Sequence, residues 1–202
     1  MRAVALESVP STPAVTDVST PSPGAEELLI KVAVASLNGI DIATAAGHTQ
    51  GIKKLRFPLI LGQDFAGTVE ALGEDTDGFA VGDAVFGVVL KPYLGGGTLA
   101  QYVTVPADRG VTHIPVGMAS ADAAALAVAG ATAVTSLDTL GVAAGQTVLI
   151  SGAAGGVGSL AEQVAVGALR VPVTETYPLE QATEAFAAFS GGAPGKIVIS
   201  CA

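Results

Sequence analysis

The sequence contains few cysteines, few basic residues and no long apolar run, and each shortage excludes a class of protein. Cys201 is the only cysteine, so neither a disulfide nor a cysteine-based metal site can form within one chain. Nine Lys and Arg against 18 Asp and Glu give a formal net charge of -9, which argues against a phosphate-backbone partner. We therefore expect no nucleic-acid partner and a cytoplasmic location, because a reducing cytosol suits a chain without disulfides.

Hydrophobic residues make up 50% of the chain, but they are not gathered into a membrane segment. The longest apolar stretch, at 123–134, is rich in Ala, Gly and Thr and is too short to span a bilayer. The N-terminus soon meets Glu7 and Pro10, which is unlike a signal peptide. We expect a soluble protein with no membrane partner, in which the short basic run at 53–56 is a solvated loop.

The chain has two regions that differ in their sequence pattern. Residues 1–118 consist of short runs rich in Val, Ile and Leu, separated by Gly, Pro and Asp, a spacing typical of a small β-barrel or sandwich. From residue 119 onward, Ala-rich helical segments alternate with apolar runs that resemble strands. The sequence thus predicts a mixed chain, α+β or α/β, with a β-rich barrel domain at 1–118, a helical connection with a βα unit at 119–168 and further elements at 169–202.

The second half predicts a definite order of helices and strands. Ser120 is a plausible N-cap for the first helix, and the apolar run at 147–151 is of the kind buried in a parallel sheet. The helices are expected at 121–128, 132–140, 158–166 and 179–189, and the strands at 147–151, 169–174 and 196–200.

A glycine-rich segment at 153–158 follows the expected strand and opens the expected helix. It matches the pattern G-x-G-x-x-G with Ala in place of the first glycine. Such a turn lets the backbone approach a pyrophosphate, while the helix N-terminus offers free N–H groups and the positive end of its dipole. The candidate cofactor-binding residues here are Ala154, Gly155, Gly156, Val157 and Gly158.

The elements from 147 to 200 also allow an alternative, a miniature mononucleotide-binding half of βαβαβ pattern. Glu175 lies about twenty residues after Gly155, roughly where a ribose-binding acid is found. Pro172 argues against this alternative, because a central strand cannot lose that N–H group.

Several further segments resemble one family, the medium-chain dehydrogenases/reductases. The segments Gly62–Val69 and Phe79–Gly87 resemble the signature of its GroES-like catalytic domain. The segment Ser36–Asp41 resembles its loop beside the nicotinamide, Gly97–Pro106 its next strand, and Ala129–Ala133 the segment whose Thr faces the cofactor. The resemblance runs along nearly the whole chain, and it implies a GroES-like β-rich domain with a Rossmann βα unit attached.

The resemblance is to the zinc-free quinone oxidoreductase branch, which includes the zeta-crystallin-like proteins. The zinc branch has a Cys in the Asn38–Asp41 loop and a His where Gln63 lies, so we expect no metal site. The implied reaction is hydride transfer from NADPH to a small-molecule quinone or α,β-unsaturated carbonyl, with enoyl reduction as an alternative. A homo-oligomer is compatible with the family. Asn38, Asp41 and Thr132 would line the nicotinamide side of the cleft, although turn formation and helix capping are alternative roles.

The sequence departs from the resemblance in its nucleotide-binding domain. The expected helix ends near residue 166, and segments resembling the family's C-terminus, 169–182 and 195–199, follow at once. We interpret this as a deletion of on the order of 100 residues, the size of the remaining strands and helices of such a domain, with its junction near Val166 and Gly167. A non-catalytic scaffold or binding module without cofactor is therefore the alternative function.

Other residues carry weaker signals. Tyr93 and Tyr102 can in principle donate a proton to a substrate oxygen, although packing at a rim or core is their more ordinary role. Asp64 and Asp83 are expected to stabilise turns rather than act as general bases. No basic neighbour marks Cys201 as a nucleophile.

Overall fold

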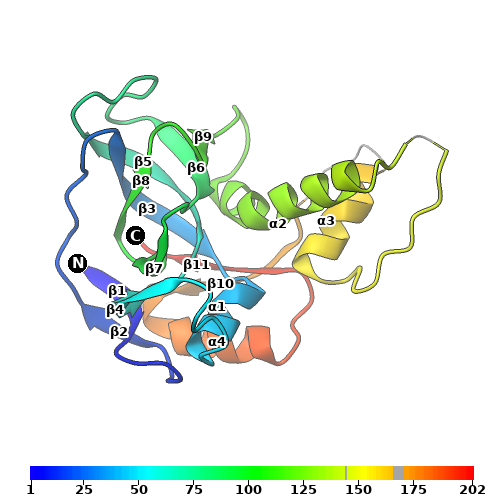
Figure 1. Cartoon of the computed structure of the whole chain (residues 1–202), viewed down its shortest axis with the longest axis horizontal. Helices are drawn as coiled ribbons and strands as arrows, with labels where there is room; N and C mark the ends of the chain where they lie inside the picture. Colours follow the sequence, from blue (N-terminus) through cyan, green and yellow to red (C-terminus); the bar gives the residue numbers. More distant parts are fainter. Residues whose placement is uncertain (144, 166–170) are drawn as a thin grey trace.

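A computed structural model describes residues 1–143, 145–165 and 171–202, and Figure 1 shows a β-rich body from which two helices extend. The strands, in chain order, are β1 (Arg2–Leu6), β2 (Ala14–Asp17), β3 (Glu27–Ser36), β4 (Lys54–Ile60), β5 (Asp64–Leu72), β6 (Ala84–Val88), β7 (Tyr93–Gly96), β8 (Tyr102–Pro106), β9 (Val111–His113), β10 (Val173–Pro178) and β11 (Lys196–Ser200). The helices are α1 (Gly39–Ala45), α2 (Ser120–Thr139), α3 (Gly156–Ala165) and α4 (Ala182–Ser190), with one 3-10 turn, η1 (Leu179–Gln181), before α4.

Two sheets enclose the main core. The smaller has the order β2-β1-β4-β7, and the larger has the order β10-β11-β3-β5-β6-β9, with β8 also paired to β3. Along β3 the side chains of Leu28, Leu29, Ile30 and Val32 are buried, and Lys31 is the one exposed residue of the strand. Such a nearly continuous buried apolar run is typical of a strand covered on both faces. The predicted β-rich domain within an α+β chain is confirmed.

The C-terminal elements complete the larger sheet. β11 runs antiparallel to the second half of β3, while β8 pairs with the first half, and β10 lies parallel to β11. The helix predicted at 179–189 is present as η1 followed by α4, and it packs Ala185 and Phe186 on the core. The strand predicted at 196–200 is confirmed as β11. The predicted strand at 169–174 begins only at Val173, and residues 169 and 170 lie outside the described residues.

α2 is one continuous helix, not the two that were predicted. Gly130 interrupts its run of alanines without ending the helix, although a helical glycine costs about 1 kcal/mol relative to Ala, and a Cβ there would lie 2.6 Å from Leu126 Cδ1. The N-cap is Ala119 rather than Ser120. By length and hydropathy α2 is the one described helix that could cross a bilayer; it packs on β3, β5 and β6, and 44% of its apolar window is buried in the protein.

The expected strand at 147–151 is wrong. These residues form no strand, and the side chain of Leu149 is 95% exposed. A buried parallel strand needs neighbours on both sides, and only residues 166–172 separate α3 from β10, too few for the further strands of a nucleotide-binding sheet. The proposed deletion junction lies outside the described residues.

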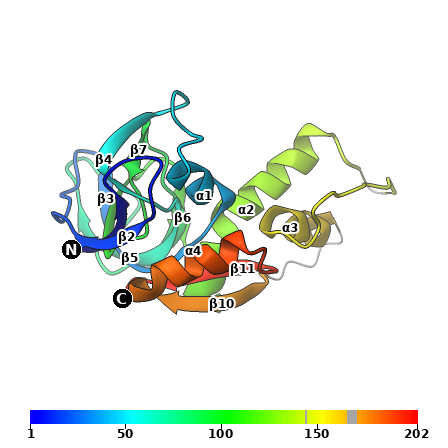
Figure 2. The ribbon, with the colours of Figure 1, turned by 90° about the horizontal axis from the view of Figure 1, so that it is seen from below.

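The alternative of a miniature mononucleotide-binding half is also wrong. β10 and β11 belong to the larger sheet beside β3, and neither pairs with residues 147–151. The Glu175 carboxylate, expected near a ribose, accepts a hydrogen bond from the Tyr177 hydroxyl. The helix predicted at 158–166 does form, beginning at Gly156, and it packs beside α2 (Figure 2).

Candidate functional site

Four polar side chains from distant parts of the sequence meet where β3, β5, β11 and the start of α1 come together. We call them the Asp64 cluster: Ser36, Asn38, Asp64 and Lys196. Lys196 Nζ donates to Asn38 Oδ1 at 2.8 Å and to the Leu37 carbonyl at 3.1 Å, and it lies 3.8 Å from Asp64 Oδ2. Asp64 Oδ2 also accepts hydrogen bonds from Asn38 Nδ2 at 2.8 Å and from the Ser36 hydroxyl. The cluster thus joins residues 158 positions apart.

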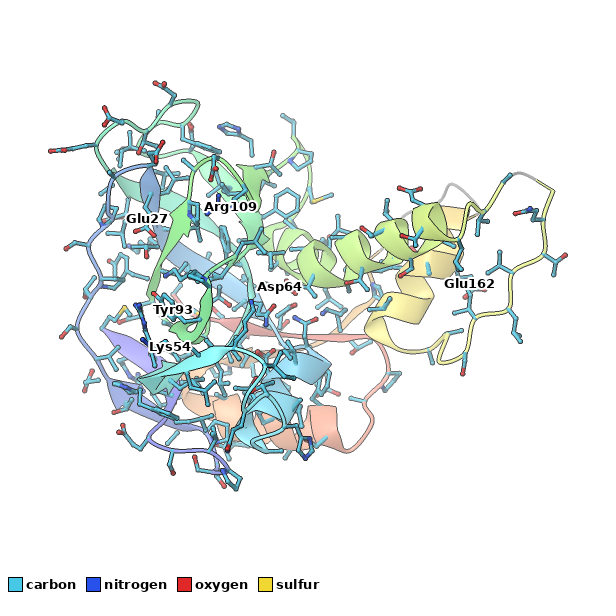
Figure 3. The ribbon with its side chains drawn as sticks, viewed as in Figure 1. Glu27, Lys54, Asp64, Tyr93, Arg109 and Glu162 are labelled. Carbon is cyan, nitrogen blue, oxygen red and sulfur yellow. The ribbon has the colours of Figure 1, made fainter. Side chains whose placement is uncertain are left out.

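Asp64 and Lys196 are both almost fully buried, with side-chain exposures of 0% and 2%. Burial raises the pKa of Asp64 and lowers the pKa of Lys196, while the attraction between them opposes both shifts. The second carboxylate oxygen of Asp64 accepts a hydrogen bond from the Val128 N–H of α2 at 2.8 Å. Asp64 therefore lies between the β-rich body and α2, as Figure 3 shows, and it does not stabilise a turn as expected.

Asn38 and Asp41 are brought together at the N-terminus of α1. The Asn38 N–H donates to Asp41 Oδ2 at 2.9 Å, and the Gly62 N–H donates to Asp41 Oδ1 at 3.0 Å. Burial raises the pKa of Asp41 to about 7, although both hydrogen bonds oppose this rise and the charge of Asp64 adds to it. A buried carboxyl group that titrates near neutrality is a frequent mark of a functional site.

The glycine-rich segment forms a turn that leads directly into α3, as predicted. A Cβ on Gly156 would lie 2.9 Å from Lys196 Cδ and 3.9 Å from the Ala129 Cβ, and one on Gly158 would overlap the Gly152 carbonyl. Glycine is therefore required here by close approach. Since Asn38 and Gly156 both contact Lys196, two of the predicted cofactor-binding segments lie against the same buried side chain.

Thr132 is placed differently. It lies in the middle of α2, so it caps no helix, and its exposed side chain donates to the Val128 carbonyl at 2.7 Å. It is about one helical turn beyond Ala129, on the helix that carries the Val128 N–H. The structure does not join Thr132 to the Asp64 cluster, and its role toward a cofactor stays a prediction.

A small recess opens beside the cluster, and Asp41, which accepts the Asn38 N–H, lines it. We call it the Lys91 recess; it encloses about 30 Å³, and its lining includes Asp41, Lys53, Gln63, Lys91, Tyr93 and Gly96. Residues 53–56 were expected to be a solvated loop, but 54–56 belong to β4, where Lys54 and Arg56 are exposed and Leu55 is half-buried against the core. The Arg56 guanidinium stacks 3.6 Å above the Tyr93 ring centroid, so Tyr93 packs at a rim as expected. Figure 3 shows Lys54 and Tyr93 beside each other on β4 and β7.

Comparison with known proteins identifies the scaffold. The family model of the alcohol dehydrogenase GroES-like domain matches residues 24–116. The 2-methylene-furan-3-one reductase of Solanum lycopersicum is 34% identical over 167 residues, and quinone-oxidoreductase QR1 of Triphysaria versicolor is 36% identical over 155 residues. The quinone oxidoreductase from Coxiella burnetii has the same fold, with a TM-score of 0.88 at 22% identity over 99% of both chains. The chain belongs to the medium-chain dehydrogenase/reductase superfamily, among the quinone-oxidoreductase-like members.

This superfamily member is short relative to its relatives. The two curated relatives match 79% and 74% of this chain but only 42% and 46% of their own lengths. An alcohol dehydrogenase superfamily protein from Novosphingobium aromaticivorans, 34% identical with a TM-score of 0.74, matches 87% of this chain and 53% of its own. The chain thus spans less than half the length of the curated relatives it matches.

Zinc-dependent members of the superfamily hold their metal with Cys and His. Among the residues described here, no three His, Cys, Asp or Glu side chains gather to hold an ion. Gln63 lines the Lys91 recess, and Cys201 is buried, with burial raising the pKa of its thiol to about 12. A thiol with so high a pKa is a poor nucleophile near neutrality, as the sequence suggested.

Sequence reasoning missed Lys196 and misread Asp64. A signal for Lys196 was available, because a lysine that opens an otherwise apolar strand is buried only if it is paired. Its partners could not be read from the chain, since they lie on β5 and at the start of α1. For Asp83 the prediction is confirmed: its Oδ2 accepts the Ala80 N–H at 2.8 Å within a turn.

Proposed function

We propose that this chain carries the quinone-oxidoreductase type of activity, the transfer of a hydride from NADPH to quinones or α,β-unsaturated carbonyls. The observation that carries the proposal is the position of Lys196, whose ammonium binds Asn38 and whose side chain contacts Gly156. A loop expected beside the nicotinamide and a loop expected around the pyrophosphate thus meet at one residue. The names of the curated relatives, a reductase of 2-methylene-furan-3-one and quinone oxidoreductases, support the same reaction class.

The residues present fit the pyrophosphate of a dinucleotide. The N–H groups in the first turn of α3 have no intrahelical acceptor, and the turn before them is built from residues without bulky side chains. Ala154 to Gly158 would hold the phosphates at the positive end of the α3 dipole. Bound there, NADPH would supply the hydride, and the chain would supply orientation and exclusion of water.

Asp41 is the titratable group that this reaction can use. Its carboxyl lines the Lys91 recess, and because burial raises its pKa to about 7, it is protonated in part of the molecules near neutral pH. An acceptor that takes a hydride must also take a proton, and a general acid works best with a pKa near the working pH. We assign Asp41 Oδ1 or Oδ2 as the place where that proton is held.

An enoyl reductase would use the same cofactor site with a different acceptor. A scaffold without cofactor is favoured by one observation, the exposure of the segment before the glycine-rich loop, where Leu149 is 95% exposed. A loop held by its own helix, by Lys196 and by the Gly195 N–H on the Ala154 carbonyl has fewer constraints than one held at the end of a sheet strand. Cofactor binding decides between the enzyme and the scaffold.

Calorimetric titration with NADPH tests the proposal, using Gly155→Asp as the variant. A Cβ at Gly155 would lie 3.3 Å from the Gly152 carbonyl oxygen, so the side chain fits with a small adjustment and places a carboxylate where the phosphates would lie. The exposed Thr183→Asp on α4 adds the same charge away from the loop. We expect binding at about 10 μM or tighter in the wild type and in Thr183→Asp, and none in Gly155→Asp. If millimolar NADPH gives no heat with the wild type, the proposed activity fails and the scaffold without cofactor is the better description.

We also propose a cytoplasmic location and self-association of the chain. The location rests on the single buried thiol, which suits a reducing compartment. Self-association rests on the apolar residues exposed along the α2 and α3 arm, including Val134, Leu140 and Val157.

A further inference from the structure

The Lys91 recess gathers positive charge in an acidic chain. The chain has nine Lys and Arg residues, and four of them border the recess or flank Tyr93 at its rim: Lys53, Lys54, Arg56 and Lys91. In the part of the chain that the structure describes, none of these four takes part in an ion pair. Unpaired positive charges concentrated at one recess attract an anion, the more so because the rest of the chain is acidic.

The side chains at the recess converge on Gly96. Lys91 Nζ donates to Thr104 Oγ1 at 2.9 Å and lies 5.9 Å from the Tyr93 ring centroid. A Cβ on Gly96 would lie 3.0 Å from Lys91 Nζ and 3.4 Å from the Tyr93 hydroxyl oxygen. An ammonium and a phenol therefore face the same patch of bare backbone. Both are donors that suit a carboxylate, which accepts hydrogen bonds through two oxygens.

Among the described residues, no carboxylate forms an ion pair with Lys91. Glu27 attracts Lys91, but its carboxylate accepts the Gly24 N–H at 2.9 Å. Asp41 also lines the recess, yet both of its oxygens accept backbone N–H groups. Burial lowers the pKa of Lys91, and the attraction of Glu27 opposes this shift.

We propose that the Lys91 recess binds a carboxylate carried by the acceptor, which makes the substrate an enone acid or quinone acid rather than a neutral carbonyl compound. That the bound molecule is the hydride acceptor rests on the proposed function, whereas binding of a carboxylate in the recess does not require the cofactor. The volume of about 30 Å³ exceeds the about 10–15 Å³ that one water requires and suits a group of a few heavy atoms. The reacting carbonyl would lie outside, toward Asp41.

Calorimetry without cofactor tests the site with 3-benzoylacrylate, an enone carboxylate, and with its methyl ester. The matched variants are Lys91→Met and Lys31→Met, since both remove one positive charge and Lys31 lies exposed on β3 away from the recess. We expect the acid to bind the wild type at least about tenfold more tightly than the ester, as a charge-assisted hydrogen bond implies. Lys91→Met removes this preference, whereas Lys31→Met keeps it.

A second variant covers the case in which Lys91→Met fails to fold. Gly96→Ala changes no charge but places a methyl group 3.0 Å from Lys91 Nζ, and we expect it to weaken acid binding several-fold. Equal affinity of the wild type for acid and ester overturns the proposal, and so does an equal affinity for acetate, which would mark a general anion site. Acid binding in a chain that does not bind NADPH supports the carboxylate site while the proposed reductase function fails. NADPH binding without any preference for the acid overturns this inference alone.

Discussion

The β-rich body and the arm beyond α2 use equally apolar residues in opposite ways. In the body, Leu28, Ile30 and Phe65 are fully buried between two sheets. In the arm, Leu140 and Leu149 are 73% and 95% exposed. The two regions differ in partners and not in hydrophobicity, because every strand of the body pairs with another strand, whereas the segment at 147–151 pairs with no described strand and only Ile150 packs on α2 and α3. An apolar run specifies burial only where the rest of the fold supplies a surface to bury it against.

The largest effect is expected where the body is tied together, at Lys196. Replacing it by Met leaves the buried Asp64 carboxylate without its counter-charge, and breaking a buried pair in this way destabilises by about 3–5 kcal/mol. Urea unfolding measures the loss. The exposed pair of Arg2 with Glu180 is the control, and Arg2→Met should change stability by less than about 1 kcal/mol.

The double variant Lys196→Met with Asp64→Asn sharpens this result, since it removes both charges. It should recover part of the loss. If Lys196→Met were as stable as the wild type, the Asp64 cluster would not stabilise the β-rich body. The body and the arm would then not differ in the way proposed here.

The next effect is a dependence of stability on pH that comes from Asp41. Its pKa is about 7 in the folded chain against 3.8 in a model peptide, so between these values the folded state binds a proton that the unfolded state does not. The stabilising contribution is therefore complete below about pH 4 and is lost as the pH rises through about 7, at roughly 1.4 kcal/mol per unit of pKa shift.

Melting temperatures of the wild type and of Asp41→Asn, measured between pH 4 and 8, isolate this contribution. The difference between the two proteins should shrink as the pH rises, because only the wild type loses stability through this group. Asp77→Asn, at an exposed turn, removes a carboxyl without burial and should run parallel to the wild type. If the difference in melting temperature between the wild type and Asp41→Asn stayed constant with pH, the pKa of Asp41 would not be raised in the folded chain.

The smallest effect is expected in the arm. Leu149→Asp should change the free energy of unfolding by no more than about 0.5 kcal/mol, as is usual for an exposed position. A loss above about 1 kcal/mol in chemical denaturation would mean that Leu149 is buried in solution. Light scattering of the two proteins would then show whether a second copy of the chain covers it.

The fold was largely predictable where local pattern and partner coincide. The short apolar runs of the β-rich body, the helix that became α4 and the final strand β11 all follow from patterns visible in the sequence. The glycine-rich turn and α3 also form as expected. The run at 147–151 has the same local signal as a buried strand, and it failed because its burial depends on elements the sequence does not place beside it.

The candidate site was predictable only in part, for a related reason. Asn38 and Asp41 lie three residues apart and form their contact locally, so one loop that resembles the family named both, and their role toward a nicotinamide stays a prediction. Lys196 and Asp64 are recognisable as site residues only in the structure, because β11 and β5 flank β3 and bring the two side chains together in a buried position. Sheet order is a non-local property, and no spacing along the chain encodes it.

The place of β11 has a consequence for how the protein is made. The second half of one β3 edge stays open until residue 200 has left the ribosome, although β3 itself ends at Ser36. A nascent chain that carries an unpaired strand edge in a central sheet is prone to pair with other chains. We therefore expect chaperones to shield this edge during translation. A chain truncated shortly before β11 would keep the edge open and would tend to aggregate.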